Sequence, residues 1–221
     1  MGSELPDGID CDVHPALPGM ATLVPFLDPY WQEQVTVRGI DGLDLASFPL
    51  RMEAHGRRDW RDGTAKPGSS LEKLCSDALD AFHSRLAICN PLYGASAIYN
   101  PYFAAAVAHA INQWIVCEWL DKDPRLRASV TIAADNAEYA VEEIERRADD
   151  ARFVQVLLLS QGDAPLATVG TGRSMRRPNG TECRSACMRA ARSATPSRRT
   201  AGLPTTWRIM PRMPSRSRPT C

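Results

Sequence analysis

The residues with the clearest chemical potential stand near the start of the chain, in the stretch GIDCDVHP (residues 8–15). Asp10, Asp12 and His14 occur there at every second position. Residues two apart in a strand lie on one side, so we expect these side chains to face one point. Carboxylate oxygens and imidazole nitrogens bind zinc, and manganese or iron where more oxygens join. The spacing predicts part of a metal site.

Within this predicted half-site, Asp12 and His14 are the expected metal ligands. Asp10 lies one step deeper and serves either as a hydrogen-bond acceptor behind them or as a further ligand. The alternative is that these are ordinary residues of a loop or turn. The pair would face the carboxyl end of its strand, which is where α/β barrels and open α/β sheets place their chemistry.

The elements that must position this pair alternate along the chain. Apolar periodicity and β-branched residues predict strands and amphipathic helices in turn. The strands are expected at 8–12, 87–89, 126–132 and 152–159, and the helices at 22–38, 69–86, from 101 to about 120, and 135–148. This order predicts an α/β fold with a parallel sheet and right-handed crossovers, as in half of an eight-stranded TIM barrel or in an open sheet. No Gly-rich loop follows any strand, which disfavours a dinucleotide fold.

Some individual residues carry further predictions. Asn100 is expected to cap its helix, and Asp135 with Glu138 resembles a capping box. Trp114 and Trp119 are expected in the core. Asn90 and Tyr93 of NPLYGAS follow the second strand and are candidate substrate contacts at the mouth of a pocket. The other histidines, His55, His83 and His109, have no paired metal ligand at useful spacing. His83 and His109 lie on predicted helices and are expected to be surface or packing residues.

Bulk composition divides the chain into two parts. The 221 residues carry 26 basic and 26 acidic side chains, but residues 171–221 hold twelve arginines, no lysine and one acid, Glu182. Residues 1–170 therefore hold 14 basic and 25 acidic residues. No signal peptide or membrane-spanning run is seen, and seven irregularly spaced cysteines argue against a disulfide framework. We therefore expect a cytoplasmic protein.

Three longer stretches carry a family resemblance: IDCDVHP, NPYFAAAVAHAINQWIVCEWLDKDPRLRASVTI and AEYAVEEIERRADDARFVQVLLL. Together they resemble the amidohydrolase-related metal-dependent enzymes, in particular the branch that is similar to aminocarboxymuconate-semialdehyde decarboxylase. The likeness covers about residues 8–166, which corresponds to the N-terminal half of a usual member.

The resemblance implies a TIM barrel that binds one divalent metal, with zinc expected first and manganese or iron as alternatives. Asp12 and His14 match the pair on the first strand, where histidine is commoner than aspartate at the first position. Two further histidines and an aspartate on later strands complete the site in the family. The implied reactions are hydrolysis or non-oxidative decarboxylation of a small, often aromatic, carboxylic acid. Members are often homo-oligomers.

The resemblance stops near residue 166, so we divide the chain into a partial barrel domain (1–166) and a tail (167–221). Prolines and arginines give the tail the composition of a disordered basic segment. A frameshift also explains it: read one base earlier, the Cys187–Met188 codons permit histidine, within a string that looks like the next barrel unit. The remaining ligands and the catalytic aspartate are then absent from this frame.

We therefore expect a metal-dependent hydrolase or decarboxylase that is inactive in this form, with poor folding, weak metal binding and no catalytic residue in frame. The alternative is a non-catalytic interaction protein with a basic tail that binds nucleic acid or another partner. Nucleic-acid binding is disfavoured, because only Trp207 offers a ring for stacking and no motif organises the charges. A smaller enzyme with an open sheet that uses Asp10, Asp12 and His14 alone is a third reading.

Overall fold

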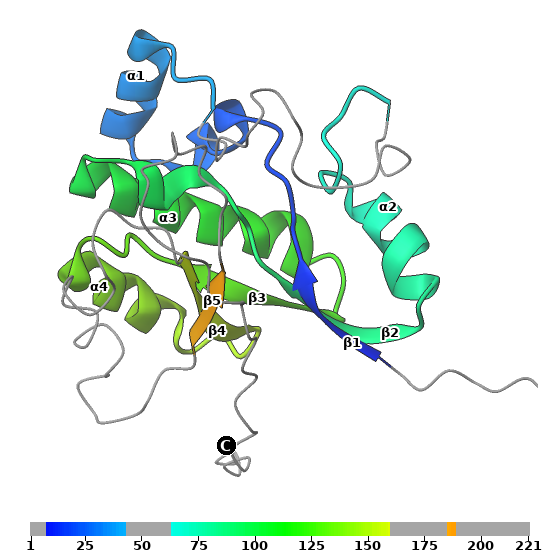
Figure 1. Ribbon diagram of the computed structural model, residues 1–221. Helices are drawn as coiled ribbons and strands as arrows, with labels where there is room; N and C mark the ends of the chain where they lie inside the picture. The colour runs from blue at the N-terminus through cyan, green and yellow to red at the C-terminus, as the bar shows by residue number, and fades with distance from the viewer. Residues whose placement is uncertain (1–7, 43–62, 160–184, 189–221) are drawn as a thin grey trace, which may run out of the picture.

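The protein is described by a computed structural model over residues 8–42, 63–159 and 185–188 (Figure 1). Strands and helices alternate along the chain. In order they are β1 (Gly8–Val13), α1 (Pro29–Arg38), α2 (Leu71–Leu74), β2 (Ser84–Cys89), α3 (Pro101–Ile115), β3 (Leu126–Thr131), α4 (Ala137–Arg147), β4 (Phe153–Leu159) and β5 (Ser185–Met188). Short π-helical segments continue α2 as far as Asp80 and α3 as far as Leu120.

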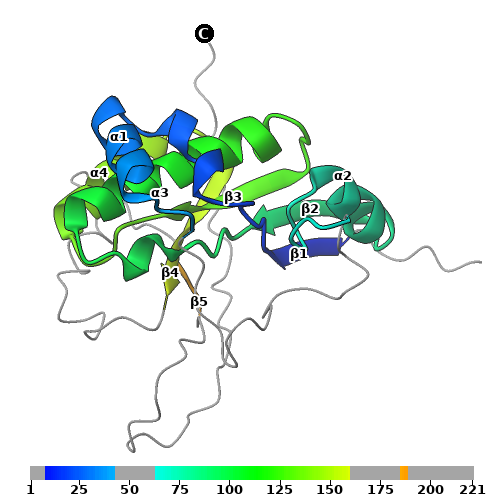
Figure 2. The same ribbon diagram turned by 90° about the horizontal axis from the view of Figure 1, so that it is seen from above.

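The five strands form one sheet in the order β1-β2-β3-β4-β5, and every neighbouring pair is parallel. Consecutive parallel strands joined by helices are the arrangement of one half of a (β/α)8 barrel. The predicted fold class is therefore confirmed. Figures 1 and 2 show α3 and α4 packed along the same side of this sheet.

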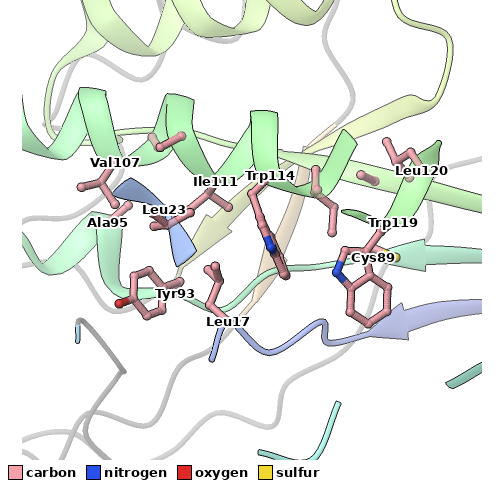
Figure 3. Packing of buried hydrophobic residues seen from close by; sticks show 14 of the residues in the cluster. Leu17, Leu23, Cys89, Tyr93, Ala95, Val107, Ile111, Trp114, Trp119 and Leu120 are labelled. Carbon is pink, nitrogen blue, oxygen red and sulfur yellow. The ribbon is translucent and has the colours of Figure 1, made fainter. Parts of the chain in front are cut away.

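The main core lies between α3 and the first strands (Figure 3). Asn100 begins α3 as predicted, because its side-chain oxygen accepts hydrogen bonds from the backbone N–H groups of Tyr102 and Phe103. The apolar face of α3 is fully buried, and the rings of Trp114 and Trp119 pack edge to face with centroids 6.0 Å apart. Their predicted place in the core is confirmed.

Two local predictions were wrong. The segment 22–38 is not one helix: 3-10 turns at Met20–Thr22 and Val24–Phe26 precede α1, which begins after Asp28. The reason is that Pro25 and Pro29 each lack the amide hydrogen that a continuous helix needs. Helix α4 is capped by Asn136 and not by Asp135, since Asn136 Oδ1 accepts from the backbone of Glu138 and Tyr139.

Strand β5 lies within the tail, where the composition predicts no regular structure. Its four residues pair in parallel with β4, from Val156 opposite Ser185 to Leu159 opposite Met188. These four residues are the part of the predicted tail that the structure describes. The rest of the predicted tail lies outside the described residues. Within the part of the chain that the structure describes, no helix is long and apolar enough to cross a membrane.

Candidate functional site

The candidate site begins at an irregularity in β1. Along the pairing with β2, Asp10 lies opposite Ala87 and Val13 lies opposite Cys89, so three steps on β1 match two on β2. This extra residue is a β-bulge at Cys11–Asp12, and bulges re-aim side chains at strand ends. The strict alternation expected from the sequence therefore does not hold through this stretch. Asp10 Oδ1 instead accepts a hydrogen bond from the Asp12 backbone N–H, at 3.0 Å.

Asp12 and His14 nevertheless lie together. His14 Nε2 and Asp12 Oδ1 are 3.4 Å apart, which is longer than a strong direct hydrogen bond. Two ligand atoms that share a tetrahedral zinc ion at bond lengths of about 2.0–2.2 Å are themselves about 3.4 Å apart. The spacing of the two donor atoms therefore fits a shared divalent metal.

The orientation of the His14 ring supports the same conclusion. His14 Nδ1 lies 3.0 Å from the backbone carbonyl oxygen of Asn90. A carbonyl oxygen only accepts, so Nδ1 must carry the hydrogen in the neutral ring and Nε2 must carry the lone pair. Metal-binding histidines are commonly fixed in this way by a carbonyl behind the ring. The ring thus directs Nε2 toward the Asp12 carboxylate.

Local charge also favours a cation at the bulge. Burial, and then the charges of Asp10 and Asp12, raise the pKa of the Cys11 thiol that lies between them. The direction of these two charge effects shows that the bulge carries a negative potential, because a like charge nearby makes ionisation harder. A divalent cation would offset this potential.

Asn90 connects this pair to the rest of the sheet. It follows β2 directly and is completely buried. Its side-chain amide donates to the Cys11 carbonyl at 3.1 Å and to Asp12 Oδ1 at 3.4 Å. Its backbone N–H donates to the Val13 carbonyl at 2.7 Å, which ties the ends of β1 and β2 together. Asn90, predicted as a substrate contact, thus bonds to both predicted metal ligands, Asp12 and His14.

Gly68 supports His14 from the other side, and the sequence analysis did not single it out. Its φ is +80°, and a Cβ added there would lie 2.8 Å from the His14 carbonyl oxygen. The Gly68 carbonyl accepts a hydrogen bond from the Ala16 N–H at 2.9 Å. A residue with a side chain would push the backbone of His14 away, so this approach requires glycine. A lone glycine in a long loop gives no sequence signal of such a contact.

Replacing Gly68 by alanine is expected to destabilise the protein by about 2 kcal/mol, because the left-handed backbone and the collision with His14 both add to the cost. Zinc affinity should fall as well, since the backbone that carries the ligand must move. Gly63 is the matched control: its φ is +60°, but nothing lies within 4 Å of an added Cβ. Chemical unfolding and zinc titration of Gly68→Ala and Gly63→Ala measure both effects. Equal zinc affinities in the two variants would contradict the prediction.

The other residues singled out from the sequence lie elsewhere. Tyr93 is 4% exposed within the main core, so its role as a substrate contact stays a prediction (Figure 3). His83 stands in a turn with φ +51° and not on a helix. His109 does have an acidic partner, Glu143 on α4, 2.9 Å away. His55 lies outside the described residues.

No group of three or more His, Cys, Asp or Glu side chains among the described residues could hold a metal ion. Within residues 8–42, 63–159 and 185–188, Asp12 and His14 therefore stand as a pair, without a third possible metal ligand beside them. The arrangement places one carboxylate and one imidazole together at the carboxyl end of a parallel sheet and holds the imidazole in a fixed orientation.

The fold is thus a parallel α/β sheet with a carboxylate and an imidazole at the end of its first strand. The family model described as Amidohydrolase matches residues 9–173, and the chain belongs to this family. The match extends seven residues beyond the predicted boundary at 166.

One solved structure similar to this chain is that of 2,6-dihydroxybenzoate decarboxylase from Rhizobium. The two are 18% identical, with a TM-score of 0.42, over 80% of this chain and 42% of the decarboxylase. This chain thus spans less than half the length of that protein. No curated protein matches the chain.

Proposed function

We propose that Asp12 and His14 are two ligands of one divalent metal in a site for hydrolysis or non-oxidative decarboxylation of a small carboxylic acid. Zinc is the first candidate, and manganese and iron are the alternatives. Family membership supports the general chemistry. The observation that carries the proposal is the 3.4 Å spacing of Asp12 Oδ1 and His14 Nε2, with the His14 tautomer set by the Asn90 carbonyl.

Each residue has a definite part in this proposal. Asp12 supplies a negatively charged oxygen and His14 a neutral nitrogen, while Asn90 holds both of them in place. A bound divalent metal would polarise a water molecule or the carboxyl group of the substrate. The contacts of Asn90 favour a positioning role over the predicted substrate contact. That substrate contact remains a prediction.

A complete site of this kind needs further metal ligands, and the described residues place none beside Asp12 and His14. The family resemblance implies further ligands on later strands, and the frameshift interpretation accounts for their absence from residues 167–221. We therefore expect weak metal binding and negligible turnover from this chain. The nucleotide sequence through the codons of residues 160–221 tests the interpretation, which an early stop in the alternative frame would overturn.

The metal proposal is tested by zinc binding to purified full-length chain and to His14→Ala. Loss of the imidazole is expected to weaken zinc binding by at least about tenfold, because one of two described donors disappears. His83→Asn is the matched control, since His83 is exposed and asparagine tolerates its positive φ. Metal content by elemental analysis and affinity by competition with a chelator are the measurements.

Zinc binding of equal strength in His14→Ala and the unchanged chain would contradict the proposed site. Zinc binding that is lost in His83→Asn but kept in His14→Ala would place the metal elsewhere. The alternative of a non-catalytic protein with a basic partner-binding tail predicts neither change, and it predicts salt-sensitive binding of nucleic acid instead.

A further inference from the structure

A row of polar side chains crosses the sheet from β4 to the candidate metal ligands. Asn90, which follows β2, and Ser129, which lies in β3, are both completely buried. Gln155 of β4 lies directly opposite Ser129 in the strand register. Ser129 Oγ bonds to Asn90 Oδ1. Gln155 Nε2 lies 2.9 Å from Ser129 Oγ and 3.4 Å from Asn90 Oδ1. The three side chains thus form one hydrogen-bonded row that ends at Asp12.

The direction of every hydrogen bond in this row follows from its last member. The Cys11 backbone carbonyl only accepts, so the Asn90 group that faces it must be the NH2 group. Asn90 Oδ1 therefore faces Ser129, and the Ser129 hydroxyl must donate to it. The Ser129 oxygen is then left to accept from the Gln155 amide. All donors in the row consequently point from β4 toward β1.

We propose that Ser129 and Gln155 are positioning residues for the metal pair, acting through the side chain of Asn90. This inference rests on the proposed function of Asp12 and His14. With Ser129 and Gln155 in place, Asn90 must present its NH2 group to Asp12 and the Cys11 carbonyl. Without those donors the described contacts hold the Asn90 amide only from the β1 side, through the Cys11 carbonyl and Asp12 Oδ1, and a flipped amide would direct an oxygen at the Asp12 carboxylate. The row also uses all four hydrogen-bonding positions of the Asn90 amide.

The matched comparison lies on the same strand. Ser129 and Thr131 are two apart on β3, so they lie on the same face of the sheet. Both are buried, but Thr131 Oγ1 has no hydrogen-bond partner among the residues that the structure describes. Replacing Thr131 by valine therefore removes a buried hydroxyl that is outside the row. Replacing Ser129 by alanine removes one that is inside it.

The experiment measures cobalt or zinc affinity of the full chain in three variants. Ser129→Ala is expected to weaken metal binding about fivefold, the effect of one lost hydrogen bond on a ligand. Ser129→Thr keeps the hydroxyl and should recover affinity, while Thr131→Val should bind metal as the unchanged chain does. Equal affinity in Ser129→Ala and Thr131→Val, with both folded, would overturn the inference.

A second measurement needs no metal and separates this inference from the proposed function. The side-chain NH2 protons of Asn90 should exchange slowly with solvent in the unchanged chain and faster in Ser129→Ala and in Gln155→Glu. In Gln155→Glu the new carboxylate can only accept a hydrogen bond. The Ser129 hydroxyl would then donate to this carboxylate and turn away from Asn90. Unaltered Asn90 exchange in both variants would overturn the row as a positioning device. A chain that binds no metal but shows the altered exchange would contradict the metal proposal alone.

Discussion

Replacing Glu143 by glutamine is expected to lower the free energy of unfolding by about 3 kcal/mol at neutral pH. Glu143 is on α4 and only 4% exposed, yet it carries a carboxylate. Four side chains hold it: Glu143 Oε2 contacts His109 at 2.9 Å and Arg146 at 2.7 Å, and Oε1 contacts Arg147 at 2.8 Å and Asn112 at 2.9 Å. A neutral amide of the same shape would leave these donors, of which Asn112 and Arg147 are buried, with a weaker partner.

This cluster joins three elements. Asn112 of α3 also donates to the Thr131 carbonyl at 2.8 Å and accepts from the Thr131 N–H at 2.9 Å, which satisfies the end of β3 beyond its pairing with β2. Arg146 approaches His109 Nδ1 at 3.0 Å, but both donors converge on Glu143 Oε2 and cannot bond to each other. The carboxylate is therefore the common acceptor on which α3, α4 and β3 depend.

The same carboxylate predicts how stability depends on pH. Burial would raise the pKa of Glu143, but hydrogen bonds from His109, Arg147 and Asn112 outweigh burial and lower the pKa to about 2 from its ordinary value of 4.5. Because the pKa is lower in the folded protein, its stabilisation is complete above about pH 4.5 and is lost as the pH falls toward 2. The difference between the unchanged chain and Glu143→Gln should shrink over that range.

Urea unfolding at pH 7, 4 and 3 measures this effect. Glu142→Gln is the matched control: Glu142 is the preceding residue, its side chain is 59% exposed, and it pairs with Arg146 on the helix surface. Exposed pairs of this kind contribute about 0.5 kcal/mol or less. Equal losses of stability in Glu142→Gln and Glu143→Gln would show that the buried network does not hold the helices together.

Replacing Asn90 by alanine is expected to destabilise the protein by about 3 kcal/mol and to weaken zinc binding more than tenfold. The stability loss arises because removal of the amide leaves buried donors and acceptors without partners, at about 1–3 kcal/mol for each such group. The loss of zinc affinity arises because Asp12 loses its donor and the position of the Asn90 backbone behind His14 is no longer fixed. Unfolding and chelator competition measure the two effects separately.

Asn112→Ala separates these effects, since Asn112 is also completely buried but its side chain bonds to Thr131 and Glu143, away from Asp12 and His14. It should cost a similar amount of stability and leave zinc affinity unchanged in the folded protein. If both asparagine variants weaken zinc binding equally, the loss reflects general destabilisation. Asn90 would then not be a positioning residue.

The amino-acid sequence by itself determined the alternation of strands and helices, the start of α3 at Asn100, the burial of Trp114 and Trp119, and the proximity of Asp12 and His14. These features depend on residues within a few positions of one another, where periodicity and capping chemistry act directly. The family resemblance rests on continuous stretches of sequence of this local kind, and it indicated the α/β fold class that the structure has.

Only the tertiary structure decided how the candidate site is held. The bulge in β1, the contact of Gly68 with His14, and the row from Gln155 to Asn90 each depend on the register between segments that are far apart in the chain. His109 and Glu143 are likewise 34 residues apart and meet only because α3 and α4 pack side by side. Such contacts are fixed by the packing of whole elements, which leaves no local pattern in the sequence from which to predict them.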